Sequence, residues 1–145
     1  MDNRSDLLHL QEQLCFPIYA TSRMITRLYQ PHLDAIDLTY PQYLTMLVLW
    51  EKDNLKIGDL GDRIYLKTNT LTPLLKKLEA KKMIVRERSK EDERSVIISL
   101  TKKGKDLKHK ASVIPLRLLE SLDMTKEELI QMRTLMWKML DKFEI

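Results

Sequence analysis

The spacing of apolar residues between positions 60 and 100 predicts two helices followed by two strands. Apolar side chains recur at helical spacing over 60–66 and again over 68–79. Two strand-like runs, 83–88 and 95–100, come next and are separated by a charged turn. Two short helices followed by a hairpin are typical of a winged helix-turn-helix, a module that reads DNA. The pattern therefore predicts a mainly α fold with a small β wing.

The second of these helices has two faces of opposite character. Its inward face is expected to consist of leucines at the spacing i, i+3, i+4, i+7, namely Leu71, Leu74, Leu75 and Leu78. Short hydrogen-bonding groups at its start and cations further along suit a helix that meets base edges and phosphates. Pro73 is expected in the first turn, where backbone N–H groups have no partner within the helix. The residues predicted to face DNA are Lys67, Thr68, Asn69, Thr70, Thr72, Lys76 and Lys77.

The N-terminal part of the chain predicts a helix over about 6–30 that proline interrupts. Pro17 removes a backbone donor, so we expect this helix to kink or restart near it. A restart would place Cys15 just before a helix N-terminus, where the partial positive charge favours a thiolate. A further proline, Pro31, is expected to open a short separate element through Ile36.

The segment 43–51 is apolar on most sides, which predicts a buried helix at the centre of the domain. Residues 55–57 are a candidate third strand. After the hairpin, Thr101 is expected to cap a long helix that reaches about residue 121, and Pro115 is expected to bend it.

A capping box over 125–128 opens the last predicted helix. Its apolar residues recur every three or four positions, as Leu129, Met132, Met136, Met139 and Phe143. We interpret the helices of 6–36 and 101–145 as a homodimer interface that flanks a DNA-binding part over 39–100, all within one domain of 1–145. Packing of these helices inside a single chain is the alternative.

Charge is concentrated where the helix and the hairpin are predicted. The chain has 145 residues, the size of one ordinary domain, and a net charge of +4. Residues 67–88 include seven basic and two acidic residues, a net charge of +5 within this segment alone. This favours phosphate binding. A solvated helix face is the other interpretation of the charge.

Several classes of protein are excluded by what the sequence lacks. No apolar run approaches the ~18–20 residues of a membrane span, and the first residues are no signal peptide, so we expect a cytoplasmic protein without a membrane partner. One cysteine precludes an intramolecular disulfide, and the three histidines are too dispersed for a metal site. The usual catalytic motifs and phosphate loops are missing, so neither an enzyme nor a cofactor is expected.

Several motifs together resemble one family. They are Thr70–Glu79 in the helix, Asp92-Glu-Arg94-Ser95 in the wing and Ile98–Gly104 after it. The chain resembles the MarR family of dimeric bacterial transcription regulators over almost its whole length. Gln13-Leu-Cys-Phe16, with Tyr19, Tyr29 and 39–43, is similar to the organic-hydroperoxide-sensing, OhrR-type branch. That branch usually has Asp-Ser-Gly where this chain has Lys67-Thr68-Asn69, so the resemblance implies no base preference there.

The resemblance implies a repressor that binds a pseudopalindromic operator in double-stranded DNA as a homodimer. It implies that Cys15 is the peroxide sensor, with Tyr29 and Tyr40 of the other subunit bonded to its sulfur and Tyr19 close by. Arg94 would enter the minor groove and be steadied by Asp92. Arg86 would contact the DNA backbone or groove.

Chemistry at the single sulfur follows from the thiolate. A thiolate attacks a peroxide to give sulfenic acid, which then condenses with a small cellular thiol or is oxidised further. A lone cysteine is otherwise a small buried hydrophobe. Three other functions remain open: a regulator released from DNA by a small phenolic ligand, a thiol peroxidase, and a helical adaptor that does not bind DNA.

Overall fold

The computed structural model describes residue 4 and residues 6–143 of the chain. The chain divides after Tyr40 into two compact units, 1–40 and 41–145, which are described separately. Among the described residues, no helix has the length and apolar character that crossing a bilayer requires. Within the same residues, no three histidine, cysteine or carboxylate side chains are grouped as metal ligands would be.

The first unit contains two short 3₁₀ turns and one long helix. The turns are η1 (Asp6–Leu8) and η2 (Leu10–Glu12), and α1 (Cys15–Asp34) follows. The predicted restart near Pro17 is confirmed, because this proline is the third residue of α1 and so lies where no intrahelical N–H is needed. The prediction of a helix from residue 6 is wrong, since that stretch forms only 3₁₀ turns.

Pro31 does not open a separate element, as was predicted, but lies inside α1. A proline in this position costs the hydrogen bond to the carbonyl four residues earlier. Leu33, two residues later, is completely buried, and this burial offsets the lost bond. The helix therefore continues to Asp34.

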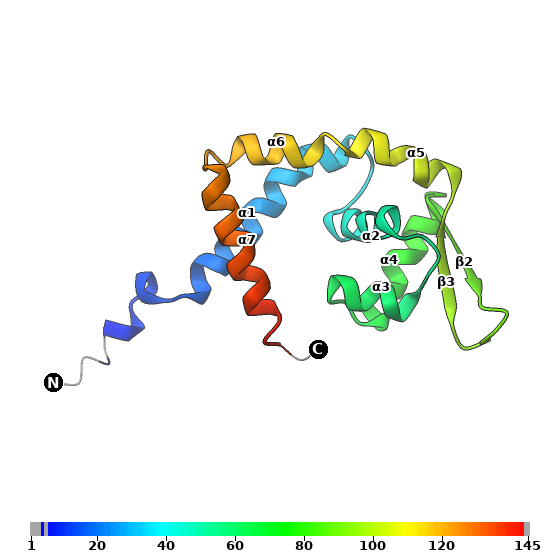
Figure 1. Cartoon of the computed structure of the whole chain (residues 1–145), viewed down its shortest axis with the longest axis horizontal. Helices are drawn as coiled ribbons and strands as arrows, with labels where there is room; N and C mark the ends of the chain where they lie inside the picture. Colours follow the sequence, from blue (N-terminus) through cyan, green and yellow to red (C-terminus); the bar gives the residue numbers. More distant parts are fainter. Residues whose placement is uncertain (1–3, 5, 144–145) are drawn as a thin grey trace. The chain divides into compact units, whose positions relative to one another are not determined.

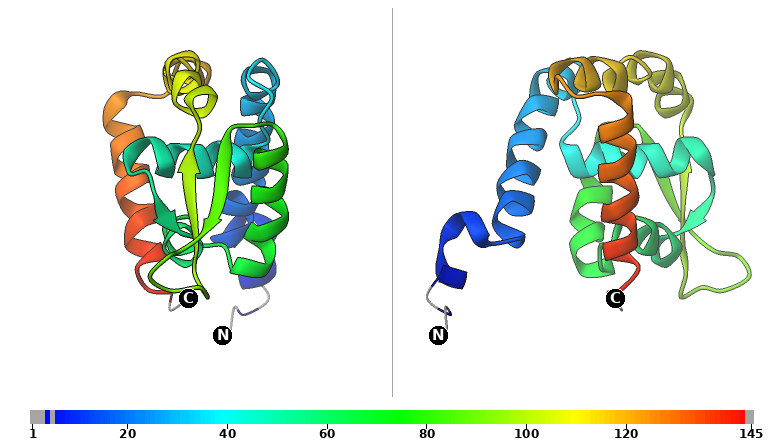
Figure 2. Two further views of the ribbon diagram at one scale, coloured as in Figure 1. Left: turned by 90° about the vertical axis from the view of Figure 1, so that its right-hand side faces the viewer. Right: turned by 60° about the vertical axis from the view of Figure 1, so that its left-hand side comes forward.

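The second unit contains the helix-turn-helix and the wing (Figure 1). Its elements are α2 (Tyr40–Glu51), β1 (Leu55–Lys56), α3 (Ile57–Ile64), α4 (Thr68–Ala80), β2 (Ile84–Arg88), β3 (Val96–Leu100), α5 (Lys102–Ala111), α6 (Ile114–Ser121) and α7 (Lys126–Leu140). The strands form an antiparallel sheet in the order β1-β3-β2, which confirms the predicted hairpin and the third strand. The helices α2, α3 and α4 lie on one side of this sheet (Figures 1 and 2).

The core of the second unit matches the apolar pattern. Leu71, Leu75 and Leu78 of α4 are fully buried, whereas the fourth predicted leucine, Leu74, is only half-buried. Most of α2 is buried, as predicted, with Tyr43, Met46 and Leu49 among its least exposed side chains. This core fixes the orientation of α4, because one side of the helix is held against the remainder of the unit.

Two predictions about proline in this unit are wrong. Pro73 is the sixth residue of α4 and not in the first turn, so the carbonyl of Asn69 loses its usual donor. The buried leucines on either side of Pro73 keep the helix intact. Pro115 does not bend one long helix: α5 ends at Ala111, and α6 begins at Ile114 with Pro115 in its first turn, where proline is tolerated.

Two helix caps were predicted correctly. Thr101 Oγ1 accepts a hydrogen bond from the backbone N–H of Gly104 at 3.0 Å and begins α5. Thr125 and Glu128 form the predicted capping box of α7. No residue of α7 is buried in the single chain, so its apolar positions are available for another surface.

Candidate functional site

The first turns of α4 present polar side chains to solvent. Thr68, Asn69 and Thr70 are exposed, and so are Lys67, which precedes the helix, and the later Lys76 and Lys77. Thr72 is half-buried, and its Oγ1 donates to the carbonyl of Thr68 at 2.8 Å. At 100° per residue, Thr68, Asn69, Thr72 and Lys76 share one side of the helix, away from the buried leucines. The structure thus brings most of the predicted DNA-facing residues onto one exposed surface.

A tight turn between α3 and α4 sets the start of this surface. Tyr65 adopts a left-handed conformation with φ of 58° and ends α3. The chain then passes so close to Gly61 that a Cβ there would lie 2.5 Å from the carbonyl oxygen of Leu66. Glycine is therefore required at position 61 for α4 to begin where it does.

Side chains close the turn of the wing from within. Ser89 Oγ accepts from the backbone N–H groups of Glu91 and Asp92, each at 3.3 Å. Asp92 Oδ1 accepts from the backbone N–H of Arg94 at 3.1 Å, and its Oδ2 accepts from Ser95 Oγ at 3.2 Å. Asp92 therefore shapes the backbone that carries Arg94, and both side chains are exposed. The sequence analysis did not single out Ser89, whose place at the start of a charged turn was the available signal.

Arg86, predicted to contact DNA, is held by a residue that the sequence analysis missed. Glu79, near the end of α4, accepts from Arg86 Nε at 3.3 Å and Nη2 at 3.2 Å. The second oxygen of Glu79 accepts from the backbone N–H of Arg86 at 2.9 Å. This carboxylate joins α4 to β2, and so joins the two elements that are predicted to meet DNA.

The substitution Glu79→Gln is expected to lower the free energy of unfolding by about 1 kcal/mol, because the partly exposed pair loses its charge but keeps one acceptor. Urea denaturation measures the change. Glu51→Gln is the matched control, since it breaks a more exposed pair with Arg63 and is expected to have almost no effect. Equal effects of the two substitutions would contradict a special role for Glu79.

The sulfur lies at the start of α1. Cys15 is the first residue of the helix and is exposed. Tyr19 follows one turn later on the same side, is 61% exposed, and accepts from Arg23 Nη1 at 3.4 Å. The Arg23 guanidinium also lies over the Tyr19 ring, 5.6 Å from its centroid. The cysteine is therefore not the small buried hydrophobe that a lone cysteine usually is.

Tyr29 and Tyr40 form a separate pair. Their ring centroids are 4.9 Å apart and their planes are tilted by 49°. Burial raises the pKa of Tyr40, so its phenol stays neutral and keeps its O–H as a donor. Fourteen residues of α1 separate Cys15 from Tyr29, a rise of about 21 Å along the helix. Cys15 and Tyr29 of the same chain are thus too far apart for a hydrogen bond.

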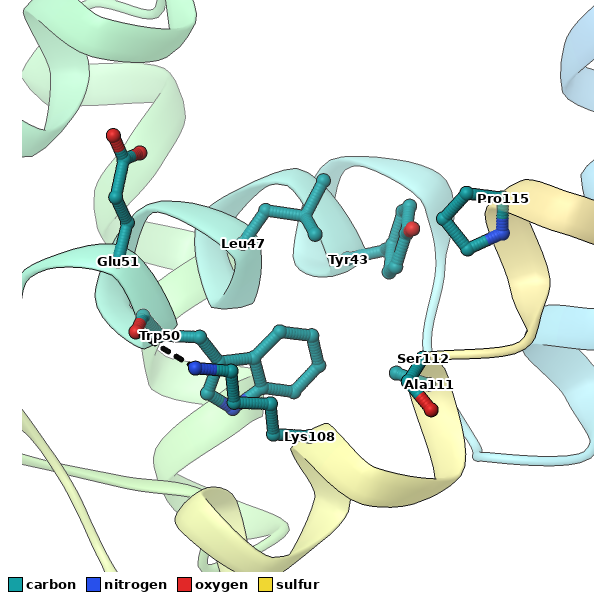
Figure 3. Close-up of a pocket in the computed structure, with 8 residues that line it drawn as sticks. All are labelled: Tyr43, Leu47, Trp50, Glu51, Lys108, Ala111, Ser112 and Pro115. Atoms are coloured by element: carbon teal, nitrogen blue, oxygen red, sulfur yellow. Dashed lines mark hydrogen bonds between the residues drawn. The ribbon is translucent and has the colours of Figure 1, made fainter.

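A pocket of about 360 Å³ lies between α2 and α5. Figure 3 shows its lining, which includes Tyr43, Leu47 and Trp50 of α2 and Ala111 of α5. Trp50 Nε1 donates to the carbonyl of Gly104 at 2.8 Å, and Lys108 Nζ donates to the carbonyl of Trp50 at 3.4 Å. The pocket is therefore mostly apolar and has one cation at its edge.

Comparison with known proteins was made on both sequence and structure. Residues 27–111 match the family model described as transcriptional regulator SarA/Rot. The chain is 45% identical to an organic hydroperoxide resistance transcriptional regulator of Bacillus subtilis, over 97% of this chain and 96% of that protein. It is 40% identical to the transcriptional regulator SarZ of Staphylococcus saprophyticus, over 92% of this chain and 91% of that protein.

Solved structures of the regulator AbfR, one of which names Staphylococcus epidermidis as its source, are also similar. Reduced AbfR bound to DNA matches with a TM-score of 0.79 at 31% identity, covering 95% of this chain and 96% of that one. AbfR with a disulfide formed matches with a TM-score of 0.64 at 30% identity, covering 97% and 93%. The winged-helix fold and the sequence relationship therefore agree over nearly the whole chain.

Proposed function

We propose that this chain, which belongs to the MarR family of transcription regulators and within it to the OhrR-type branch, is a homodimeric repressor that releases operator DNA when Cys15 is oxidised. The observation that carries the proposal is the exposed polar start of α4 beside a wing whose turn holds Arg94 outward. In this proposal α4 enters the major groove with Asn69 and Thr70 near the base edges. The neighbouring lysines contact phosphates.

Apolar side chains that remain exposed support the dimer. In the second unit, Ile130, Leu135 and Trp137 of α7 are exposed by 42%, 59% and 51%. In the first unit, the exposed apolar residues of α1 include Phe16 and Met24. Apolar surface of this extent marks a protein–protein contact, and we propose that a second copy of the chain covers it. The residues of 6–36 and 101–145 would then be dimerisation helices around a DNA-binding part of 39–100.

The spacing along α1 supports a sensor shared between two copies. Since about 21 Å of helix separates Cys15 from Tyr29 in one chain, only another copy brings a Tyr29 phenol to this sulfur. The packed pair of Tyr29 and Tyr40 would then supply two hydroxyl groups together. Tyr19 would lie beside the sulfur from the same chain, one helical turn away.

The proposed chemistry starts from the Cys15 thiolate and an organic hydroperoxide. The sulfur attacks the outer oxygen, the O–O bond breaks, and an alcohol leaves as the sulfur becomes sulfenic acid. A small cellular thiol then forms a mixed disulfide with Cys15 and releases water. The added bulk lies at the start of α1, where we propose the second copy packs, so the two α4 helices would lose the spacing that one operator requires.

Selection from a pool of random duplexes tests DNA reading by the reduced protein. We expect an inverted repeat whose half-site centres are about 34–36 Å apart, one turn of B-DNA. Asn69→Ala is expected to relax one base position per half-site by ~1–3 kcal/mol. Lys76→Gln is the matched control, because losing a phosphate contact weakens all sequences alike and lowers the salt dependence by about 1 for each contact. Failure to enrich any sequence would contradict a sequence-reading α4.

The pocket between α2 and α5 supports a second candidate function, release of DNA by a small phenolic ligand. Its aromatic lining from Tyr43 and Trp50 suits a ring, and Lys108 at its edge suits an acidic substituent. Adding a phenolic acid such as salicylate to the Cys15→Ser variant on its selected operator separates the two functions. Release of that variant from DNA would support the ligand function, and its retention at saturating salicylate would contradict this function.

A further inference from the structure

The end of the hairpin that lies opposite the wing tip carries a second concentration of positive charge. Helix α5 contains five lysines and one aspartate, a net charge of +4, which equals the net charge of the whole chain. All five lysine side chains are exposed. We call this surface the α5 lysine face, and it consists of Lys102, Lys103, Lys105, Lys108 and Lys110.

This face is far from the start of α4. Ile84 pairs with Leu100 at the base of the hairpin, where α5 begins, and Arg88 pairs with Val96 toward the tip (Figure 1). Helix α4 runs from the polar residues at its start to Ala80 near the same base, and its 13 residues rise about 20 Å. Lys103 Nζ donates to the carbonyl of Lys81 at 3.0 Å, which joins α5 to the end of α4. The DNA segment proposed to meet Thr68 and Asn69 therefore does not account for these lysines.

The chemistry of the face selects one kind of partner. Within the described part of the chain, Lys102, Lys105 and Lys110 form no ion pair. Two of them, with Lys103 and Asp106, line a shallow groove of about 390 Å³. Lysine ammonium groups act as point charges toward phosphates. Helix α5 offers neither an aromatic ring for stacking on single-stranded bases nor an exposed large apolar side chain to anchor a protein.

We propose that the α5 lysine face is a second docking surface, independent of base sequence, for the phosphate backbone of a duplex DNA segment. The proposal rests on the proposed function, because α4 must already hold one duplex. A protein bound to its operator then holds a second DNA segment and bridges the two. Each lysine that meets a phosphate releases a counterion, so bridging weakens steeply as salt rises.

A bridging experiment tests this. The full-length reduced protein is bound to its selected operator duplex on beads, and a fluorescent duplex without the operator is added at low salt. We expect the beads to retain the second duplex. The triple variant Lys102→Gln, Lys105→Gln, Lys110→Gln is expected to retain at least about tenfold less of it, and the logarithmic salt slope is expected to fall by roughly two to three. Its operator affinity, measured with a differently coloured label, is expected to stay within about twofold.

The matched control keeps the charge. Replacing the same three lysines with arginine is expected to restore retention of the second duplex, because phosphate contacts need only the cation at these positions. Equal retention by the glutamine variant and the unmodified protein would overturn the proposal. Binding of a polyglutamate probe in place of the duplex would also overturn it and would indicate an acidic protein partner. An unmodified protein that leaves the operator itself unbound would contradict the proposed function, a failure that the operator label distinguishes.

Discussion

Replacing Cys15 with serine is expected to leave operator binding intact and to abolish its response to organic hydroperoxides. Serine keeps the size and the helix start but cannot form a sulfenic acid. In the unmodified protein, a loss of about 4 kcal/mol on oxidation would lower DNA affinity roughly a thousandfold. A gel-shift titration with cumene hydroperoxide measures this difference, and the cysteine variant is expected to show none of it.

Mass spectrometry of the same samples is the control for the chemistry. The unmodified protein is expected to gain one oxygen, or one small thiol when a thiol is present, on the peptide that contains Cys15. Because the chain has one cysteine, other oxidised residues would be identified by their own peptides. Release of the Cys15→Ser variant from DNA by hydroperoxide would show that the sulfur is not the switch.

The substitution Gly104→Ala is expected to have the largest effect on stability. A Cβ at this position would lie 2.1 Å from the backbone oxygen of Met83, in the buried contact between α5 and β2. Backbone has little room to move there, because the carbonyl of Met83 also accepts from Thr101 N–H at 3.1 Å. We expect the free energy of unfolding to fall by about 2–4 kcal/mol, as overpacking and displaced elements do. Thermal unfolding of the reduced protein measures it.

Gly58→Ala is the matched control and is expected to have the opposite sign. No atom lies within 4 Å of a Cβ at Gly58, which lies inside α3. Alanine is favoured over glycine in a helix by about 0.5–1 kcal/mol, so this variant should be slightly more stable. A Gly104→Ala protein as stable as the unmodified one would show that α5 is not held this closely to β2.

The sequence predicted the fold well where periodicity and packing act together. The leucines of α4 and the apolar run of α2 predicted the core, and the run after residue 83 predicted the hairpin. The prolines were harder to interpret, because the cost of a missing N–H depends on its position in the helix. Pro17 falls where no hydrogen bond is lost, while Pro31 and Pro73 are tolerated because nearby leucines are buried.

The candidate site could be predicted only in part. The exposed residues of α4 follow from helical spacing, so their common side was predictable. The bonds from Glu79 to Arg86 join residues on two different elements, and spacing within one element gives no sign of them. The packing of Tyr29 against Tyr40 likewise depends on how the chain turns after α1.

Trp50 gives the protein a built-in spectroscopic reporter. The chain has two tryptophans, and the other one, Trp137, is half exposed on α7. The indole of Trp50 is bonded to the carbonyl of Gly104 and lines the pocket between α2 and α5. With Trp137 replaced by phenylalanine, emission comes from Trp50 alone and follows the joint between these two helices. Entry of a small molecule into the pocket, or a displacement of α5, then becomes visible as a change in wavelength without any attached dye.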